Sequence, residues 1–204
     1  MGLLRAFIAV EIPHEIQQAI FDKATAVLKK TTASLIRWVA AENLHLTLKF
    51  LGDVSPSNVD MLSQILRAEA DSSHCFDIRV GGIGSFPSLR RPRVLYIGIQ
   101  APAGLEALQR GVESASRKLG YETEERPFSP HLTIGRVRQD VSASDGQKIR
   151  LALENIHIDS LGTARVDSVH LFKSDLQPTG SVYTKLFSVP LHNVIASEAK
   201  QSSH

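Results

Sequence analysis

The chain of 204 residues is 43% hydrophobic and 22% charged, which fits one large domain or two small lobes with a substantial core. Its formal net charge of +2 excludes the broad basic field of a nonspecific nucleic-acid coat, so any contact with phosphates must be local. The single cysteine, Cys75, excludes an internal disulfide and favours the reducing cytoplasm, and no apolar run has the length of a membrane span or of a signal-peptide core.

The first half of the chain predicts strands and helices in alternation. RAFIAVEI predicts a strand over residues 5–12 that ends at Pro13, and apolar residues at helical spacing then predict a helix over 13–30. LHLTLKFL alternates strictly and predicts a strand over 44–51 with one buried and one polar face. The buried face would carry Leu44, Leu46, Leu48 and Phe50, and the polar face His45, Thr47 and Lys49.

Ser55-Pro56 opens a second helix in the first half, and the second half repeats the order of elements from the helix over 105–119 onward. The later predicted elements are strands over 76–86 and 94–100 around the loop PSLRRPR, a helix over 105–119 that stops at Gly120, a strand over 131–137, a weaker helix over 142–154, and strands over 163–174 and 182–189 around a turn at Gly180. We therefore expect an α+β fold with two similar lobes and antiparallel or mixed sheets. The domain should cover residues 1–191, and residues 192–204 should form a disordered tail.

Two strands begin with the same peptide, HLTLKF at 45–50 and HLTIGR at 131–136. In each copy the histidine and threonine leave one strand face about 6–7 Å apart. Histidine titrates near pH 6.5, so one imidazole can act as base while the other acts as acid, and a threonine hydroxyl can donate to an anionic oxygen. If the copies face each other, they predict a phosphate site that needs no metal and no other cofactor.

Two other interpretations of the repeated peptide are a metal site and a structural protein in which the repeat arose by chance. Each copy supplies only one metal ligand, and the other histidines (14, 74, 157, 170, 192 and 204) show no ligand spacing. The sequence also lacks the G-x-S-x-G motif, a P-loop and a Rossmann glycine pattern. If the repeat arose by chance, the two copies are not expected to face each other.

The paired motifs resemble the two H-x-T-x signatures of the 2H phosphoesterase superfamily, and in particular its RNA 2′,3′-cyclic phosphodiesterases, also described as 2′–5′ RNA ligases. The resemblance extends to about residue 191 through RAFIAVEIP, RWVAAENLHLTLKFLGDV, FPSLRRPRVLYIG, RPFSPHLTIGR and VHLFKSDLQPTGSVYTKL. It implies a bilobed fold with pseudo-two-fold symmetry and a cleft between the lobes. It also implies metal-independent hydrolysis of a terminal ribose 2′,3′-cyclic phosphate to a 2′-phosphomonoester, with reversible 2′–5′ ligation as an associated activity.

Carried over to this chain, the resemblance makes His45 the proton donor and His131 the proton acceptor, although the sequence alone does not distinguish this assignment from its reverse. Thr47, Thr133 and Arg136 would bind the substrate. The partners would be RNA ends with a 2′,3′-cyclic phosphate, tRNA fragments among them, and the protein would be a cytoplasmic monomer that binds no membrane. Alternatives are a phosphodiesterase acting on small cyclic phosphates or 2′–5′ oligonucleotides, and an RNA-end-binding module without turnover.

Strict alternation raises a difficulty for Arg136, because it places this side chain with Leu132 and Ile134, away from the site. A bulge at Gly135 would return it. Phe50 has the same parity and is expected in the core or stacked on a base, and Phe7 is a weaker candidate of the same kind. The loop arginines Arg90, Arg91 and Arg93 either contact RNA phosphates or form a solvated basic loop.

Overall fold

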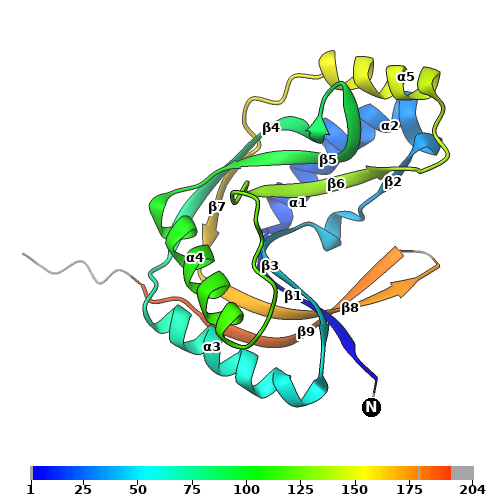
Figure 1. Cartoon of the computed structure of the whole chain (residues 1–204). Helices are drawn as coiled ribbons and strands as arrows, with labels where there is room; N and C mark the ends of the chain where they lie inside the picture. Colours follow the sequence, from blue (N-terminus) through cyan, green and yellow to red (C-terminus); the bar gives the residue numbers. More distant parts are fainter. Residues whose placement is uncertain (1, 179, 194–204) are drawn as a thin grey trace, which may run out of the picture.

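The computed structural model describes residues 2–178 and 180–193, which form two antiparallel sheets covered by helices (Figure 1). Sheet A has the order β3-β1-β8-β9 and sheet B the order β2-β6-β5-β4-β7. The strands are β1 (Leu4–Glu11), β2 (Ile36–Trp38), β3 (His45–Val54), β4 (Phe76–Ser88), β5 (Arg91–Gln100), β6 (His131–Val137), β7 (Gly162–Val166), β8 (Ser168–Gln177) and β9 (Gly180–Pro190). The α+β, two-lobed architecture expected from the sequence is confirmed.

Five α-helices lie within the described ranges, and several short turns of other helix types accompany them. The α-helices are α1 (His14–Ile20), α2 (Ala26–Thr32), α3 (Val59–Asp71), α4 (Ala103–Lys118) and α5 (Ala143–Glu154). A π turn, Phe21–Thr25, joins α1 to α2, so the helix predicted over 13–30 forms as one continuous helical segment. Gly120 ends α4 as predicted, with a φ of 87° that only glycine adopts without strain. No helix among residues 2–178 and 180–193 is both long and apolar enough to cross a membrane.

Each lobe takes strands from both halves of the chain. Sheet A combines β1 and β3 with β8 and β9, and α3 and α4 pack on it. Sheet B combines β2 with β4 to β7, and α1, α2 and α5 lie on its side of the molecule (Figure 1). The two halves of the sequence repeat the same order of elements, but they do not correspond to the two lobes. Each lobe is built from strands of both halves.

The structure departs from the predicted elements in three main places. Residues 163–174 do not form one strand, because the chain leaves sheet B at Asp167 and enters sheet A, which divides this segment into β7 and β8. The loop predicted over PSLRRPR shrinks to a turn at Leu89 and Arg90, since β4 and β5 pair as far as Ser88 and Arg91. The three-residue strand β2 was not predicted.

The core is one continuous apolar cluster between the sheets and their helices, with a small second cluster on the other face of sheet A. This second cluster contains Phe7, Ala9 and Phe172, with Tyr183 packed against it. Near the end of the described chain, His192 donates its amide hydrogen to the carbonyl of Ser73. The sequence predicted a disordered tail over residues 192–204, and positions 194–204 of that tail lie outside the described residues.

Candidate active site

The two HLT copies begin β3 and β6, one in each sheet. Leu46 and Leu132 are fully buried, while the histidines and threonines on either side of them are half-buried on the opposite face. The first three residues of each motif thus alternate as expected, with apolar packing behind a polar surface.

Both strands then carry a β-bulge at the same place. In sheet A, Ala9 pairs with Thr47 and Ile8 pairs with Lys49, so the residue between them on β3, at position 48, is extra. In sheet B, Tyr96 pairs with Thr133 and Leu95 pairs with Gly135, so Ile134 is extra in the same way. Because a bulge shifts the alternation by one residue, the residue five positions after each histidine returns to the histidine face.

This shift corrects the sequence predictions for two residues of β3. Lys49 does not share the face of His45 and Thr47; it is only 5% exposed, and its ammonium donates to the Glu113 carboxylate at 2.7 Å and to the Glu122 carbonyl. Phe50 does not enter the core and is 64% exposed. In β6 the same bulge brings Arg136 to the cleft, which answers the difficulty that strict alternation raised.

A cavity of about 60 Å³ lies between the two motifs. Its walls come from both sheets and from the segment that precedes β3. The lining residues are Val39, Asn43, His45, Thr47, His131, Thr133, Arg136 and Tyr183. The structure therefore brings together every residue that the sequence assigned to the site.

Each histidine is held by the same backbone contact. The Nδ1 atom of His45 lies 2.7 Å from the carbonyl oxygen of Asn43, and Nδ1 of His131 lies 2.7 Å from that of Ser129. A carbonyl oxygen only accepts, so Nδ1 carries a hydrogen in both rings. This leaves Nε2 of each ring as the atom that can gain or lose a proton at the cavity.

Burial lowers the pKa of both histidines below the ordinary value, against the opposing effect of their backbone hydrogen bonds. The charge of His131 lowers the pKa of His45 further, and the charge of Arg136 does the same to the pKa of His131. Protonation of one imidazole thus disfavours protonation of the other. Double protonation of the pair is therefore disfavoured, which suits a site where one imidazole acts as a base.

Aromatic rings support both imidazoles, and most of these rings were not singled out from the sequence. Phe7 stacks on His45 with 4.7 Å between centroids, and Tyr183 meets the same ring edge-on at 5.1 Å. In the other lobe, Phe86 meets His131 edge-on at 4.9 Å, and Tyr96 lies 5.5 Å away. These aromatic residues lie on other strands of the same two sheets, far from the histidines in sequence, so no local motif identifies them; of the set, only Phe7 was a candidate.

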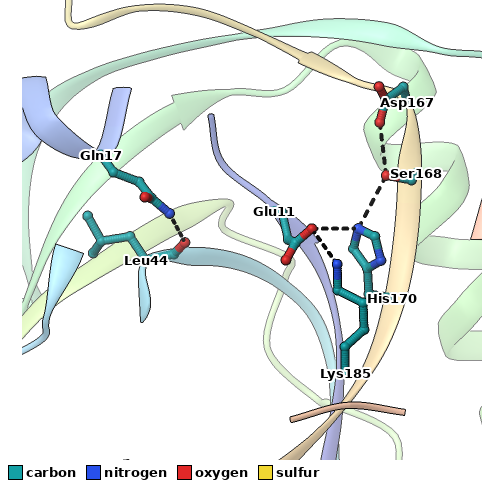
Figure 2. A network of polar contacts seen from close by, with 7 residues as sticks. All are labelled: Glu11, Gln17, Leu44, Asp167, Ser168, His170 and Lys185. Carbon is teal, nitrogen blue, oxygen red and sulfur yellow. Dashed lines mark hydrogen bonds and ion pairs between the residues drawn. The ribbon is translucent and has the colours of Figure 1, made fainter. Parts of the chain in front are cut away.

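A second, larger cavity of about 510 Å³ adjoins the first on the His45 side and shares Asn43, His45 and Tyr183 with it. Glu11, which is paired with His45 across the β1–β3 ladder, forms part of its wall. One oxygen of the Glu11 carboxylate lies 2.7 Å from Lys185 Nζ and 3.4 Å from His170 Nε2. Both contacts are drawn in Figure 2. The cavity wall thus presents hydrogen-bond acceptors beside the aromatic rings of the second apolar cluster.

His170 behind this wall is buried, and burial lowers its pKa although the Glu11 carboxylate acts in the opposite direction. Its Nε2 lies 3.2 Å from Ser168 Oγ, which in turn donates to Asp167 (Figure 2). This network orders the wall without reaching the two catalytic candidates.

The remaining candidates lie apart from the lining of either cavity. Arg90 lies in the β4–β5 turn, and Arg91 and Arg93 are exposed on β5. Within residues 2–178 and 180–193, no three His, Cys, Asp or Glu side chains are grouped so that they could hold a metal ion.

Comparisons with known proteins match this geometry. The family model described as LigT like Phosphoesterase matches the chain twice, over residues 10–96 and 97–183, with one HLT copy in each match. An RNA 2′,3′-cyclic phosphodiesterase from Methanothermobacter thermautotrophicus is 32% identical over 90% of this chain and 96% of its own length. An RNA 2′,3′-cyclic phosphodiesterase from Thermotoga maritima is 29% identical over 90% of this chain and 94% of its own length.

Solved structures agree with the sequence relatives. The crystal structure of Escherichia coli LigT complexed with 3′-AMP superposes with a TM-score of 0.73 at 28% identity, covering 93% of this chain and 98% of that one. The crystal structure of TT0787 of Thermus thermophilus superposes with a TM-score of 0.76 at 26% identity. The superposition covers 93% of this chain and 99% of that one. The double match, the shared fold and the facing motifs agree: the chain belongs to the LigT-like phosphoesterases of the 2H superfamily.

Proposed function

We propose that this phosphoesterase hydrolyses the 2′,3′-cyclic phosphate at the end of an RNA chain and leaves a 2′-phosphomonoester. The observation that carries the proposal is the matched pair of imidazoles, each with Nδ1 held by a backbone carbonyl and both at one small cavity. The relatives' names support the substrate class. The single, buried cysteine fits a cytoplasmic enzyme.

In this mechanism Nε2 of neutral His131 removes a proton from water while the water oxygen bonds to phosphorus. The bond between phosphorus and O3′ breaks, and Nε2–H of His45 protonates the leaving O3′. The product carries a free 3′-hydroxyl and a 2′-phosphate. His131 ends protonated and His45 neutral, so proton exchange with solvent restores the pair. A 5′-hydroxyl in place of water would give ligation by the same proton transfers.

Three side chains are assigned to the non-bridging phosphate oxygens. The hydroxyls of Thr47 and Thr133 approach the cavity from opposite lobes, each on the same strand face as its histidine. The guanidinium of Arg136 supplies positive charge and a planar donor pair that suits phosphate. Together they would stabilise the charge that develops on phosphorus oxygens during the displacement.

The terminal nucleoside is assigned to the larger cavity. His45 is the proposed donor to the leaving ribose oxygen, so the ribose must lie on its side, where the 510 Å³ cavity opens. That volume falls within the range of about 300–1,000 Å³ that small-ligand sites occupy. Tyr183, common to both cavities, offers a ring surface for the sugar or base.

The test is turnover of an RNA that ends in a 2′,3′-cyclic phosphate, followed in EDTA between pH 5 and 9. The wild-type protein should release the 2′-phosphate product, and His45→Ala and His131→Ala should each lower kcat by about 10² or more, because each removes one proton-transfer group. His157→Ala, which alters an exposed histidine after α5, should leave the rate unchanged.

Two outcomes would contradict the proposal. Binding of the RNA end without turnover, in wild type and variants alike, would indicate a binding module. Faster turnover of small cyclic phosphates or 2′–5′ oligonucleotides than of the RNA end would move the activity to that substrate class with the same residues.

A further inference from the structure

The pseudo-symmetry of the two lobes is broken at the outer edge of the second motif strand. In sheet A the motif strand β3 is itself the edge, whereas in sheet B the motif strand β6 has β2 beyond it. The exposed residue of β2 is Arg37, and the ladder places it directly opposite Arg136. One lobe therefore has a basic strand beside its catalytic candidate where the other lobe has none.

Arg37 lies on the cleft face of sheet B. Its neighbours on β2 point the other way, with Ile36 paired to Val137 and Trp38 paired to Gly135 on the core side. Val39, two residues beyond Arg37, continues the ladder, because its amide donates a 3.0 Å hydrogen bond to the Ile134 carbonyl. Val39 also lines the small cavity between the two motifs. Side chains two apart on a strand share a face, so Arg37 faces the same cleft.

Within the described ranges, no carboxylate pairs with either of the two arginines. Like charges directly opposite each other across an antiparallel ladder destabilise the pair. Neither guanidinium makes an ion pair or a side-chain hydrogen bond with any residue in 2–178 or 180–193, although the nearby Arg138 pairs with Asp140 at 3.4 Å. An anion bound beside both would relieve this repulsion, and guanidinium groups are suited to phosphate.

We infer that Arg37 binds a second phosphate of the RNA strand, an internucleotide diester next to the phosphate that reacts. This inference rests on the proposed function, in which Arg136 contacts the reacting phosphate. Arg37 lies one strand farther out on the same face, beside Arg136 and outside the lining of the small cavity. The enzyme would thereby prefer an RNA end over a cyclic mononucleotide, which has no second phosphate.

The test compares kcat/KM for a 2′,3′-cyclic mononucleotide and for an oligoribonucleotide that ends in the same nucleotide. Arg37→Gln should lower kcat/KM about tenfold on the oligonucleotide, as expected for one lost phosphate contact, and leave the mononucleotide unchanged. When log kcat/KM for the oligonucleotide is plotted against the logarithm of the salt concentration between 50 and 200 mM, the slope is expected to be negative. Arg37→Gln should make this slope less negative by about 0.7. Arg110→Gln removes an exposed charge from α4 and should change neither substrate nor slope.

Equal losses on both substrates would overturn the inference, because Arg37 would then act at the reacting phosphate. Unchanged activity on both would overturn it too, since Arg37 would be a solvated arginine. Failure of the proposed function is recognised separately, by a wild-type protein that turns over neither substrate. In that case the salt dependence of the oligonucleotide Kd, with and without Arg37, still supports or overturns the phosphate contact.

Discussion

At the scale of single residues, the candidate site contains two histidines that face one small cavity. Their Nδ1 atoms are fixed by carbonyls, so only Nε2 can exchange protons, and their charges repel each other. Both limbs of the pH profile of kcat/KM report the free enzyme and should lie below about pH 6.5, because burial lowers the pKa of each ring.

Arg136 offers a way to identify the base. Its charge lowers the pKa of His131, so Arg136→Gln should raise that pKa. If His131 is the base, the acidic limb of kcat/KM moves to higher pH and the basic limb stays in place, as measured between pH 4.5 and 8.5. Arg138→Gln, two residues farther along and paired with Asp140, should move neither limb. Movement of the basic limb alone would reverse the roles of His45 and His131.

At the scale of elements, the repeated bulge determines which side chains reach the cleft. Without it, Arg136 would point into the core beside Ile134, and Lys49 would enter the cleft in place of Phe50. In the second motif the residue after the bulge is a glycine, and a Cβ at Gly135 would lie 2.6 Å from Ile36 Cγ2 and 3.3 Å from Trp38 Cε3 of β2. The glycine therefore allows β2 to pack closely against β6.

A methyl group at Gly135 should separate these strands. Gly135→Ala is expected to destabilise the protein by about 1–3 kcal/mol through overpacking, and to lower activity because it displaces Arg136. Chemical denaturation measures the first effect. The matched control is Gly146→Ala in α5, where a Cβ meets nothing within 4 Å, which should stabilise by about 0.5–1 kcal/mol. Equal stability of wild type and Gly135→Ala would show that β2 can shift without cost.

The sequence predicted most elements and the correct motif faces, and its failures have physical causes. Alternation assigns faces reliably only while pairing is regular, and an extra residue in a bulge leaves no mark on the pattern of HLTLKF. Only HLTIGR carried a hint, its glycine. The division of residues 163–174 was not visible because both strands remain apolar on one side, and three residues of β2 are too few to show a period.

At the scale of the whole molecule, Lys49 links β3 to the segment that precedes β6. From β3 it reaches Glu113 on α4 and the carbonyl of Glu122, in the segment that leads to β6 and His131. The Glu113 carboxylate also accepts a hydrogen bond from the Glu124 amide at 3.2 Å. The buried ion pair thereby couples sheet A to the approach of the second motif.

Breaking this pair on one side should be costly. Lys49→Met leaves the Glu113 carboxylate without its cation, and we expect a loss of about 3 kcal/mol in unfolding free energy. Lys49→Met combined with Glu113→Gln should recover at least half of it, because no buried charge then lacks a partner. Lys173→Met, at the surface pair with Asp175, should cost at most about 0.5 kcal/mol. A double variant no more stable than Lys49→Met would mean that packing dominates.

The interleaving of the lobes also sets the order in which the enzyme can be assembled during synthesis. Ala6 pairs with Lys173, so β1 is enclosed on both edges only after β8, a strand far later in the chain, has been made. Contacts between such distant segments form late, because a long loop must close first. The support beneath His45 includes Phe172 and Tyr183, so this histidine acquires its setting only after β8 and β9 have been made, and a chain that stops before them holds the first HLT motif without its site.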